Sequence, residues 1–119
     1  MLTFNLKKEW FDKIKSGEKT HEYREVKYSW TTRLVKEFYG PENAKQHKAS
    51  IEHFLTMLRA GFVHSSGNHD ICFMNGMIPE KEKPRLYAKY KSVKIVSGKK
   101  TDLKFDGEVY DIEFELIKE

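Results

Sequence analysis

The chain has 119 residues, a length that suits one domain built around one hydrophobic core. Charged residues make up 34% and hydrophobic residues 39% of it, which is enough apolar material to fold and excludes a largely disordered chain. The chain has 22 Lys and Arg against 18 Asp and Glu. The resulting formal net charge of +4 is compatible with a polyanionic partner but does not imply one.

The single cysteine, Cys72, excludes an internal disulfide and a four-cysteine zinc site. Because its neighbours are apolar, Cys72 is predicted to be a small buried hydrophobe. No segment approaches the ~20 apolar residues of a membrane-spanning helix, and the N-terminus lacks the basic-then-apolar order of a signal peptide. We therefore expect a cytoplasmic protein that is neither exported nor inserted into a membrane.

Three elements are predicted at the start of the chain. Alternating apolar residues predict a strand at Leu2–Leu6, and apolar residues at helical spacing predict a helix at Lys7–Ser16 that Gly17 ends. A second strand is predicted at Thr20–Val26. Side chains alternate along a strand, so this one directs residues 20, 22 and 24 to one face and residues 19, 21 and 23 to the other, while the long stem of Lys19, at the mouth of the strand, can turn to either face.

The middle of the chain, at about residues 28–68, is predicted to be a mostly helical insertion. Residues 28–31 are interpreted as a break before a helix that includes Leu34 and Tyr39 and ends at Gly40. Residues 42–49 are predicted to form an exposed loop. Ser50 is expected to cap a further helix, which Gly61 ends, and residues 64–69 form a polar linker.

The last part of the chain is predicted to be mostly strands. Residues 71–74 form a short strand that ends in a turn at Asn75 and Gly76, and residues 86–95 form a long one. Its alternation changes parity near Lys91 and Ser92, which predicts a β-bulge. Residues 106 and 107, Asp-Gly, predict a hairpin turn before a final strand at residues 110–116. These elements predict a mixed α+β fold with a curved, mostly antiparallel barrel and flanking helices.

Residues Gly17–Arg24 carry the spacing Gly-x-Lys-x-x-Glu-x-Arg, which resembles the signature of the ASCH domain, a family of the PUA-like superfamily. The order of the predicted strands and helices outside residues 28–68 is similar to that family as well. This resemblance implies a PUA-like curved antiparallel β-barrel with flanking helices over residues 1–119, interrupted by the helical insertion. It also implies RNA or a nucleotide as the ligand.

Lys19, Glu22 and Arg24 are the principal candidate site residues. An arginine fork suits phosphate or carboxylate, a glutamate accepts hydrogen bonds from the amino groups of a base edge, and a nearby lysine supplies a point charge or a proton. Glu22 and Arg24 lie about 7 Å apart along one face of a strand, so they can act on one ligand. The alternative is structural, with Glu22 bridged to Arg24 or Lys19 in an ion pair.

Further binding candidates are an aromatic residue, an amide and loop lysines. Trp30, next to polar residues, is predicted to be partly exposed and to stack on a base, while Asn75 would read a base edge from the strand-ending turn. Loop lysines without an evident acidic neighbour are candidates for phosphate contact, whereas those on strands can pair across the sheet. The loop lysines are Lys81, Lys83, Lys99 and Lys100, and the other aromatic candidates are Tyr23, Phe73 and Tyr87.

Catalysis in the same cleft is the first alternative, with Lys19 and Glu22 as the candidate catalytic residues. Some ASCH relatives resemble deacylases of N4-acetylcytidine that use a lysine, a threonine and a glutamate, and others look like ribonucleases. Here the position three residues after Lys19 holds Glu22 where the deacylase branch would have threonine. A second alternative is a regulatory module whose middle helices bind a protein partner.

No cofactor and no metal are predicted. Four histidines, His47, His53, His64 and His69, fall in or near the middle segment. Their spacing matches no metal-binding signature, so solvated positions are the expectation.

Overall fold

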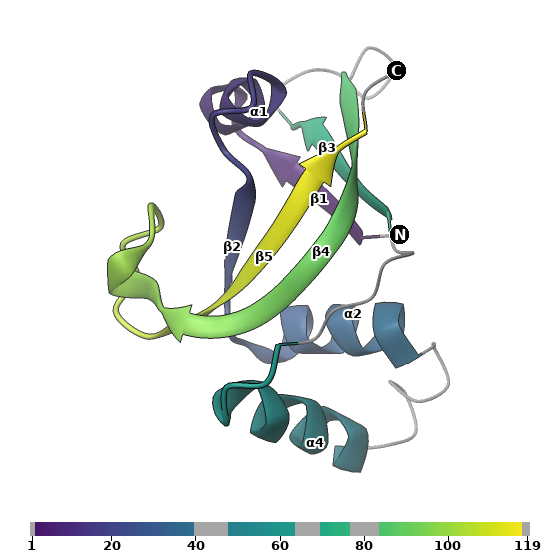
Figure 1. Cartoon of the computed structure of the whole chain (residues 1–119), viewed down its shortest axis with the longest axis vertical. Coiled ribbons are helices and arrows are strands. Elements are labelled where there is room, and N and C mark those ends of the chain that lie inside the picture. Colours follow the sequence, from purple (N-terminus) through teal and green to yellow (C-terminus); the bar gives the residue numbers. More distant parts are fainter. Residues whose placement is uncertain (1, 40–47, 64–69, 77–83, 118–119) are drawn as a thin grey trace.

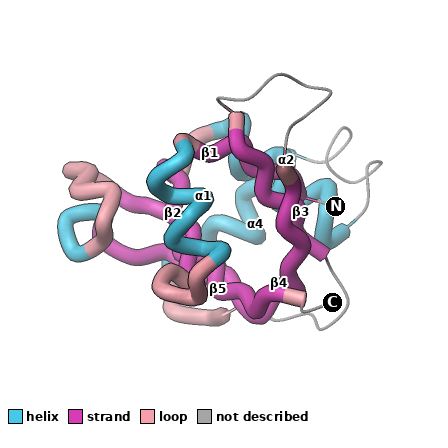
Figure 2. The backbone as a smooth tube through the Cα atoms, turned by 90° about the horizontal axis from the view of Figure 1, so that it is seen from above, coloured by secondary structure: helices cyan, strands magenta, loops and turns pink. Residues whose placement is uncertain are grey.

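A curled five-stranded sheet forms the centre of the molecule. The computed structural model describes residues 2–39, 48–63, 70–76 and 84–117. The strand order is β1-β3-β4-β5-β2, and the strands are β1 (Leu2–Leu6), β2 (His21–Glu25), β3 (Asp70–Asn75), β4 (Arg85–Ser97) and β5 (Glu108–Leu116). Seen from above, the strands follow an arc with β1 and β2 at its two ends (Figure 2). The predicted α+β class and the curved sheet are therefore confirmed in the form of a half-barrel.

Most strand pairs are antiparallel, as expected. The exception is β1, which pairs in parallel with β3 so that Leu2 faces Ile71 and Leu6 faces Asn75. In β1 the buried and exposed residues alternate without a break, which confirms the period-two pattern. The long strand β4 has a register shift between Tyr90 and Ser92 in its pairing with β5, so the predicted bulge is confirmed.

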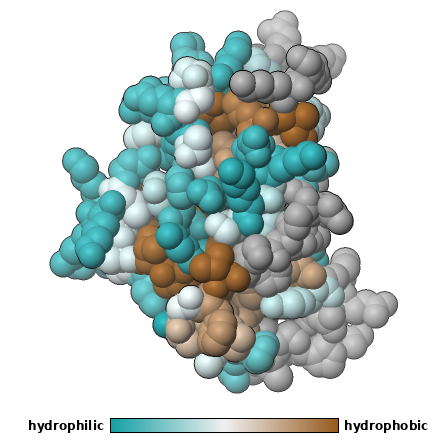
Figure 3. All heavy atoms as spheres, viewed as in Figure 1, coloured by the Kyte–Doolittle hydropathy of each residue, from teal (hydrophilic) through white to brown (hydrophobic). Residues whose placement is uncertain are grey.

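Three α-helices lie at the two ends of the described sheet. Helix α1 (Lys8–Lys15) lies at one end, while α2 (Tyr28–Tyr39) and α4 (Lys48–Arg59) lie together at the other (Figure 1). None of the helices in the described ranges is long and apolar enough to cross a membrane. The face seen in Figure 3 is mostly hydrophilic, with apolar residues gathered in separate patches.

Two glycines end helices as predicted. Gly17 follows α1 with φ +85°, and its N–H donates to the carbonyl of Ile14 at 3.0 Å. Gly61 follows α4 with φ +93°, and its N–H donates to the carbonyl of Leu58 at 3.1 Å. A left-handed residue is common at this position, and glycine adopts it without the steric cost of a Cβ.

The predicted start of each middle helix is wrong. Helix α2 begins at Tyr28, where a break was expected. The prediction missed the first turn because the buried residue on its inner face, Thr31, is polar and does not stand out in a pattern of apolar residues. The Thr31 hydroxyl lies 2.6 Å from the hydroxyl of Tyr110 on β5, which allows its burial. Helix α4 begins at Lys48, so Ser50 is not its N-cap, and the predicted loop at 42–49 is wrong at its last two residues. The other residues of that loop, and the linker at 64–69, lie outside the described residues.

The hairpin predicted at residues 106 and 107 forms between β4 and β5, but its connection is longer than a two-residue turn. Pairing between β4 and β5 ends at Ser97 and Glu108, and a loop from Gly98 to Gly107 connects the strands. The N–H of Gly98 donates to the carbonyl of Gly107 at 2.7 Å and closes the base of this loop. The loop begins with the short 3₁₀ helix η2 (Gly98–Lys100) and extends away from the sheet (Figure 1).

Candidate functional site

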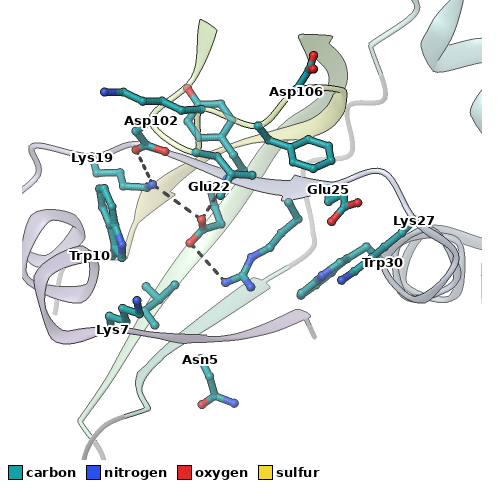
Figure 4. A pocket seen from close by; sticks show the side chains of 16 residues that line it. Asn5, Lys7, Trp10, Lys19, Glu22, Glu25, Lys27, Trp30, Asp102 and Asp106 are labelled. Carbon is teal, nitrogen blue, oxygen red and sulfur yellow. Dashed lines mark hydrogen bonds and ion pairs between the residues drawn. The ribbon is translucent and has the colours of Figure 1, made fainter. Parts of the chain in front are cut away.

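A pocket of about 780 Å³ opens beside β2. Its walls come from the end of β1, from α1, from β2, from the start of α2 and from residues 102–106 of the β4–β5 loop. In Figure 4, Trp10 and Trp30 lie on opposite sides of the pocket, with Glu22 between them. The volume falls in the range of roughly 300–1,000 Å³ that is typical of small-molecule sites.

Glu22 is the buried acid of this pocket, with 5% of the residue exposed. Its Oε1 accepts a hydrogen bond from the Tyr23 N–H at 3.1 Å and lies 3.8 Å from Lys19 Nζ. Its Oε2 lies 3.9 Å from Arg24 Nη2 and has no hydrogen-bond partner within the described structure. Burial raises the pKa of the Glu22 carboxyl, and the charges of Lys19 and Arg24 oppose this rise.

Arg24 extends from β2 towards the opposite end of the sheet. Its guanidinium carbon lies 5.1 Å from the ring centre of Phe4 on β1 and 4.9 Å from that of Trp30 on α2. Its Nε is buried and has no hydrogen-bond acceptor within the described structure. Burial lowers the pKa of the guanidinium, which still stays charged at neutral pH. The two aromatic rings therefore hold a planar cation with one unused donor.

Lys19 connects Glu22 to the β4–β5 loop. Its Nζ lies 2.8 Å from Oδ2 of Asp102, and Figure 4 shows the ammonium group between the carboxylates of Asp102 and Glu22. The same Nζ lies 4.7 Å from the ring centre of Trp10 and 5.4 Å from that of Tyr23. Only 9% of the lysine side chain is exposed, so its charge is held in place by these groups.

The alternation predicted for β2 places Glu22 and Arg24 together in the pocket. His21, on the other face, lies with its Nδ1 2.6 Å from Oδ1 of Asp111 on β5. Lys19 and Tyr23 were expected on the face of His21, yet both line the pocket with Glu22. Lys19 precedes the strand, so its long stem is free to turn towards either face.

Trp30 lies in the pocket wall and is partly buried, as expected. Its ring stacks on Phe4 at a centroid distance of 5.1 Å and an interplanar angle of 12°. The guanidinium groups of Arg24 and Arg33 also contact it, at 4.9 and 4.7 Å from its ring centre. In this arrangement Trp30 supports Arg24 and leaves little of its ring for a ligand.

The remaining candidates are spread over the molecule. Asn75 is 3% exposed at the end of β3 and does not line the pocket. Among the other aromatics, Phe73 is fully buried in the core, whereas Tyr87 is 40% exposed on β4 outside the pocket. Lys81 and Lys83 lie outside the described residues. Cys72 is buried as predicted, and burial raises the pKa of its thiol.

The strand lysines pair across the sheet as expected. Lys94 Nζ lies 3.9 Å from Asp111, and Lys91 Nζ lies 4.0 Å from Glu115. The loop residue Lys99 was expected to lack a partner, yet it lies 3.4 Å from Asp106. These pairs reduce the free positive charge of the second half of the chain.

Several pocket residues were not singled out in the sequence. Trp10 follows the helical apolar pattern and was expected only to cover the sheet, while Asp102 lies 83 positions after the lysine that it pairs with. Phe105, beside the Asp-Gly turn signal, lines the pocket without a ring contact to another described residue. Three exposed lysines at the pocket, Lys7, Lys27 and Lys104, make no ion pair with a described residue.

Among the described residues, no group of three or more His, Cys, Asp or Glu side chains is arranged to hold a metal ion. Of the four histidines considered as ligands, only His53 lies in the described ranges, on an exposed face of α4. No known protein family, characterised protein or solved structure matches the chain. The pocket geometry is therefore the main basis for a functional hypothesis.

Proposed function

We propose that this protein binds RNA or a nucleotide in the pocket beside β2. The observation that carries the proposal is the pair of buried atoms, Glu22 Oε2 and Arg24 Nε, that have no hydrogen-bond partner among the described residues. Buried polar atoms without a partner are rare because each costs about 1–3 kcal/mol of desolvation. A ligand that fills the pocket and pairs with both atoms would recover that cost.

The chemistry of the pocket walls suits a nucleotide. Aromatic rings line it next to an acid, a planar cation and exposed lysines. Aromatic faces stack on bases, and carboxylate and guanidinium groups pair with base edges. The resemblance of Gly17–Arg24 to the ASCH signature supports the same class of ligand. We propose further that the curled half-barrel is a member of the PUA-like folds.

Arg24 provides the main test. Replacing Arg24 with Ala should weaken binding of a short single-stranded RNA by roughly ten- to a hundredfold, because a charged hydrogen-bond donor is lost. We expect the melting temperature to change little, since one buried donor of the guanidinium, Nε, has no acceptor in the described part of the chain. Fluorescence anisotropy would measure binding and calorimetry the melting temperature.

The matched control is Arg33→Ala. Arg33 contacts the same Trp30 ring at 4.7 Å but is exposed and does not line the pocket, so its removal should leave RNA affinity nearly unchanged. The Arg24→Lys variant keeps the charge and loses the planar fork, and it should also bind weakly. Equal affinities for Arg24→Ala and Arg33→Ala, or no RNA and nucleotide binding by the wild type, would reject the proposal.

Hydrolysis is the second candidate, because a buried carboxyl group and an ammonium group meet in the pocket. Burial raises the pKa of Glu22, whose Oε1 lies 3.8 Å from Lys19 Nζ, so a proton-carrying group and a positive charge are both available to a bound substrate. If the protein is a hydrolase, RNA or acetylcytidine should be converted to product at a rate that Lys19→Ala reduces by at least ~100-fold. Binding without product, measured by chromatography of the same samples, would favour the binding function alone.

A further inference from the structure

The inner end of the pocket is balanced in charge. Lys19 and Arg24 supply two cations there, Glu22 supplies a buried carboxylate, and the exposed Asp102 supplies a second carboxylate to Lys19, with separations of 2.8 to 3.9 Å between opposite charges. A phosphate group at this end would meet the carboxylate of Glu22 in a buried setting, where repulsion between like charges is weakly screened. The inner end is therefore suited to a neutral group.

The same inner end offers one acceptor and one donor. Glu22 Oε2 accepts hydrogen bonds when the carboxyl is ionised, and Arg24 Nε can only donate. A neutral ring that carries an N–H beside a carbonyl oxygen or a ring nitrogen would pair with both atoms. The hydrogen-bonding edge of every common nucleobase has such a combination.

The rest of the pocket lining carries three exposed lysines, Lys7, Lys27 and Lys104, and none of them forms an ion pair with another described residue. The remaining acids of the lining are Glu25 and Asp106, and Asp106 lies 3.4 Å from Lys99. In Figure 4, Lys7 and Lys27 lie away from the group formed by Lys19, Glu22 and Asp102. Exposed, unpaired lysines are the usual contacts for phosphate groups.

We propose that the pocket holds a nucleotide with its base inward, against Glu22 and Arg24, and its phosphate outward, at Lys7, Lys27 and Lys104. This inference rests on the proposed function and adds an orientation to it. The base would also lie near Phe105, whose ring lines the pocket and is free of ring contacts within the described structure.

The test compares two probes that carry the same phosphates. One is a single-stranded RNA pentamer, and the other is a pentamer of the same backbone without bases. Binding of both is measured for the wild type, for Glu22→Gln, for Arg24→Lys, and for a triple variant with Lys7, Lys27 and Lys104 changed to Gln. A second triple variant, with Lys15, Lys36 and Lys89 changed to Gln, has the same net charge, and its changed residues are exposed outside the pocket.

We expect Glu22→Gln and Arg24→Lys each to weaken binding of the RNA by about tenfold and to leave binding of the base-free pentamer within about twofold of the wild type. The triple variant of pocket lysines should weaken both probes by the same factor, and by more than the control triple variant does. This pattern would support the orientation.

Two results would overturn the orientation while leaving the proposed function in place. One is an equal loss of affinity for both probes in Glu22→Gln or Arg24→Lys. The other is a triple variant of pocket lysines that binds both probes as well as the control triple variant. If the folded wild type binds neither the RNA nor a nucleotide, the proposed function fails, and the orientation fails with it.

Discussion

Glu22 is a buried carboxyl that the protein does not fully satisfy. Its pKa in the folded state is raised above the ordinary value of 4.5, chiefly by burial. A group of this kind stabilises the fold fully below its unfolded-state pKa, and this contribution is lost as the pH rises through the folded-state pKa. Ionisation of Glu22 therefore lowers the free energy of unfolding, as is common for residues that act on ligands.

Replacing Glu22 with Gln removes this titration and keeps the shape of the side chain. The difference in free energy of unfolding, wild type minus Glu22→Gln, should therefore decrease as the pH rises above the ordinary carboxyl value of 4.5. Urea denaturation at a series of pH values would measure this difference. Glu18→Gln, which removes one negative charge at an exposed position, is the control for the change in net charge, and a Glu22→Gln curve that runs parallel to the wild type would contradict the expectation.

The sequence predicted the composition of this site better than its contacts. Glu22 and Arg24 could be placed on one face because strand alternation is a local property of the backbone. The orientation of Lys19 depends on Asp102, which lies far along the chain and reaches it only through the folded loop. Trp30 was expected to face a ligand, but it stacks on Phe4, which comes from a distant strand and is not encoded in local patterns.

At the scale of elements, the β4–β5 loop deserves a test because it brings Asp102 and Phe105 to the pocket. Gly98, at the base of the loop, is buried, and a Cβ there would lie 2.5 Å from the Phe105 carbonyl oxygen and 2.9 Å from the Phe105 Cβ. Such contacts cannot be relieved by rotating a side chain, because they involve the backbone. The close approach of the two loop ends therefore requires glycine at position 98.

Gly98→Ala should lower the free energy of unfolding by about 1–3 kcal/mol, as overpacking of a buried position usually does. It should also weaken ligand binding, since Phe105 must shift. Gly76→Ala is the matched control, because its Cβ would come no closer than 3.4 Å to a neighbouring atom, and we expect a change within about 0.5 kcal/mol. Urea denaturation would measure the free energy of unfolding of both variants. Equal values for Gly98→Ala and Gly76→Ala would argue against a rigid loop.

Local patterns identified the elements but placed some of their ends incorrectly. The apolar residues of α2 follow helical spacing. The buried residue in the first turn of α2 is the polar Thr31, so a pattern of apolar residues does not include that turn. Its hydroxyl is satisfied by Tyr110, a contact between a helix and a distant strand. The Asp-Gly pair at 106 and 107 is a hairpin signal, yet the hydrogen bond from Gly98 closes a wider loop around it.

At the scale of the whole molecule, the half-barrel explains where the pocket lies. The two end strands of the arc, β1 and β2, do not pair with each other in the described sheet, and residues from both line the pocket. Arg24 spans this region by contacting Phe4 on β1 and Trp30 on α2. The class of fold followed from alternating patterns, but the position of the opening depends on strand order, which local patterns do not determine.

The parallel pairing of β1 with β3 has a consequence for synthesis on the ribosome. Leu2 emerges before its counterpart Ile71, and three described helices and strand β2 lie between them, so β1 must wait without its sheet neighbour. The β4–β5 hairpin joins segments that are close in sequence, and local contacts form faster than distant ones. We expect pulse-labelled hydrogen exchange during refolding to protect β4 and β5 amides before those of β1, and simultaneous protection would contradict this order. On the ribosome, β1 and β2 would therefore both wait for sheet neighbours that are made later, β3 and β5.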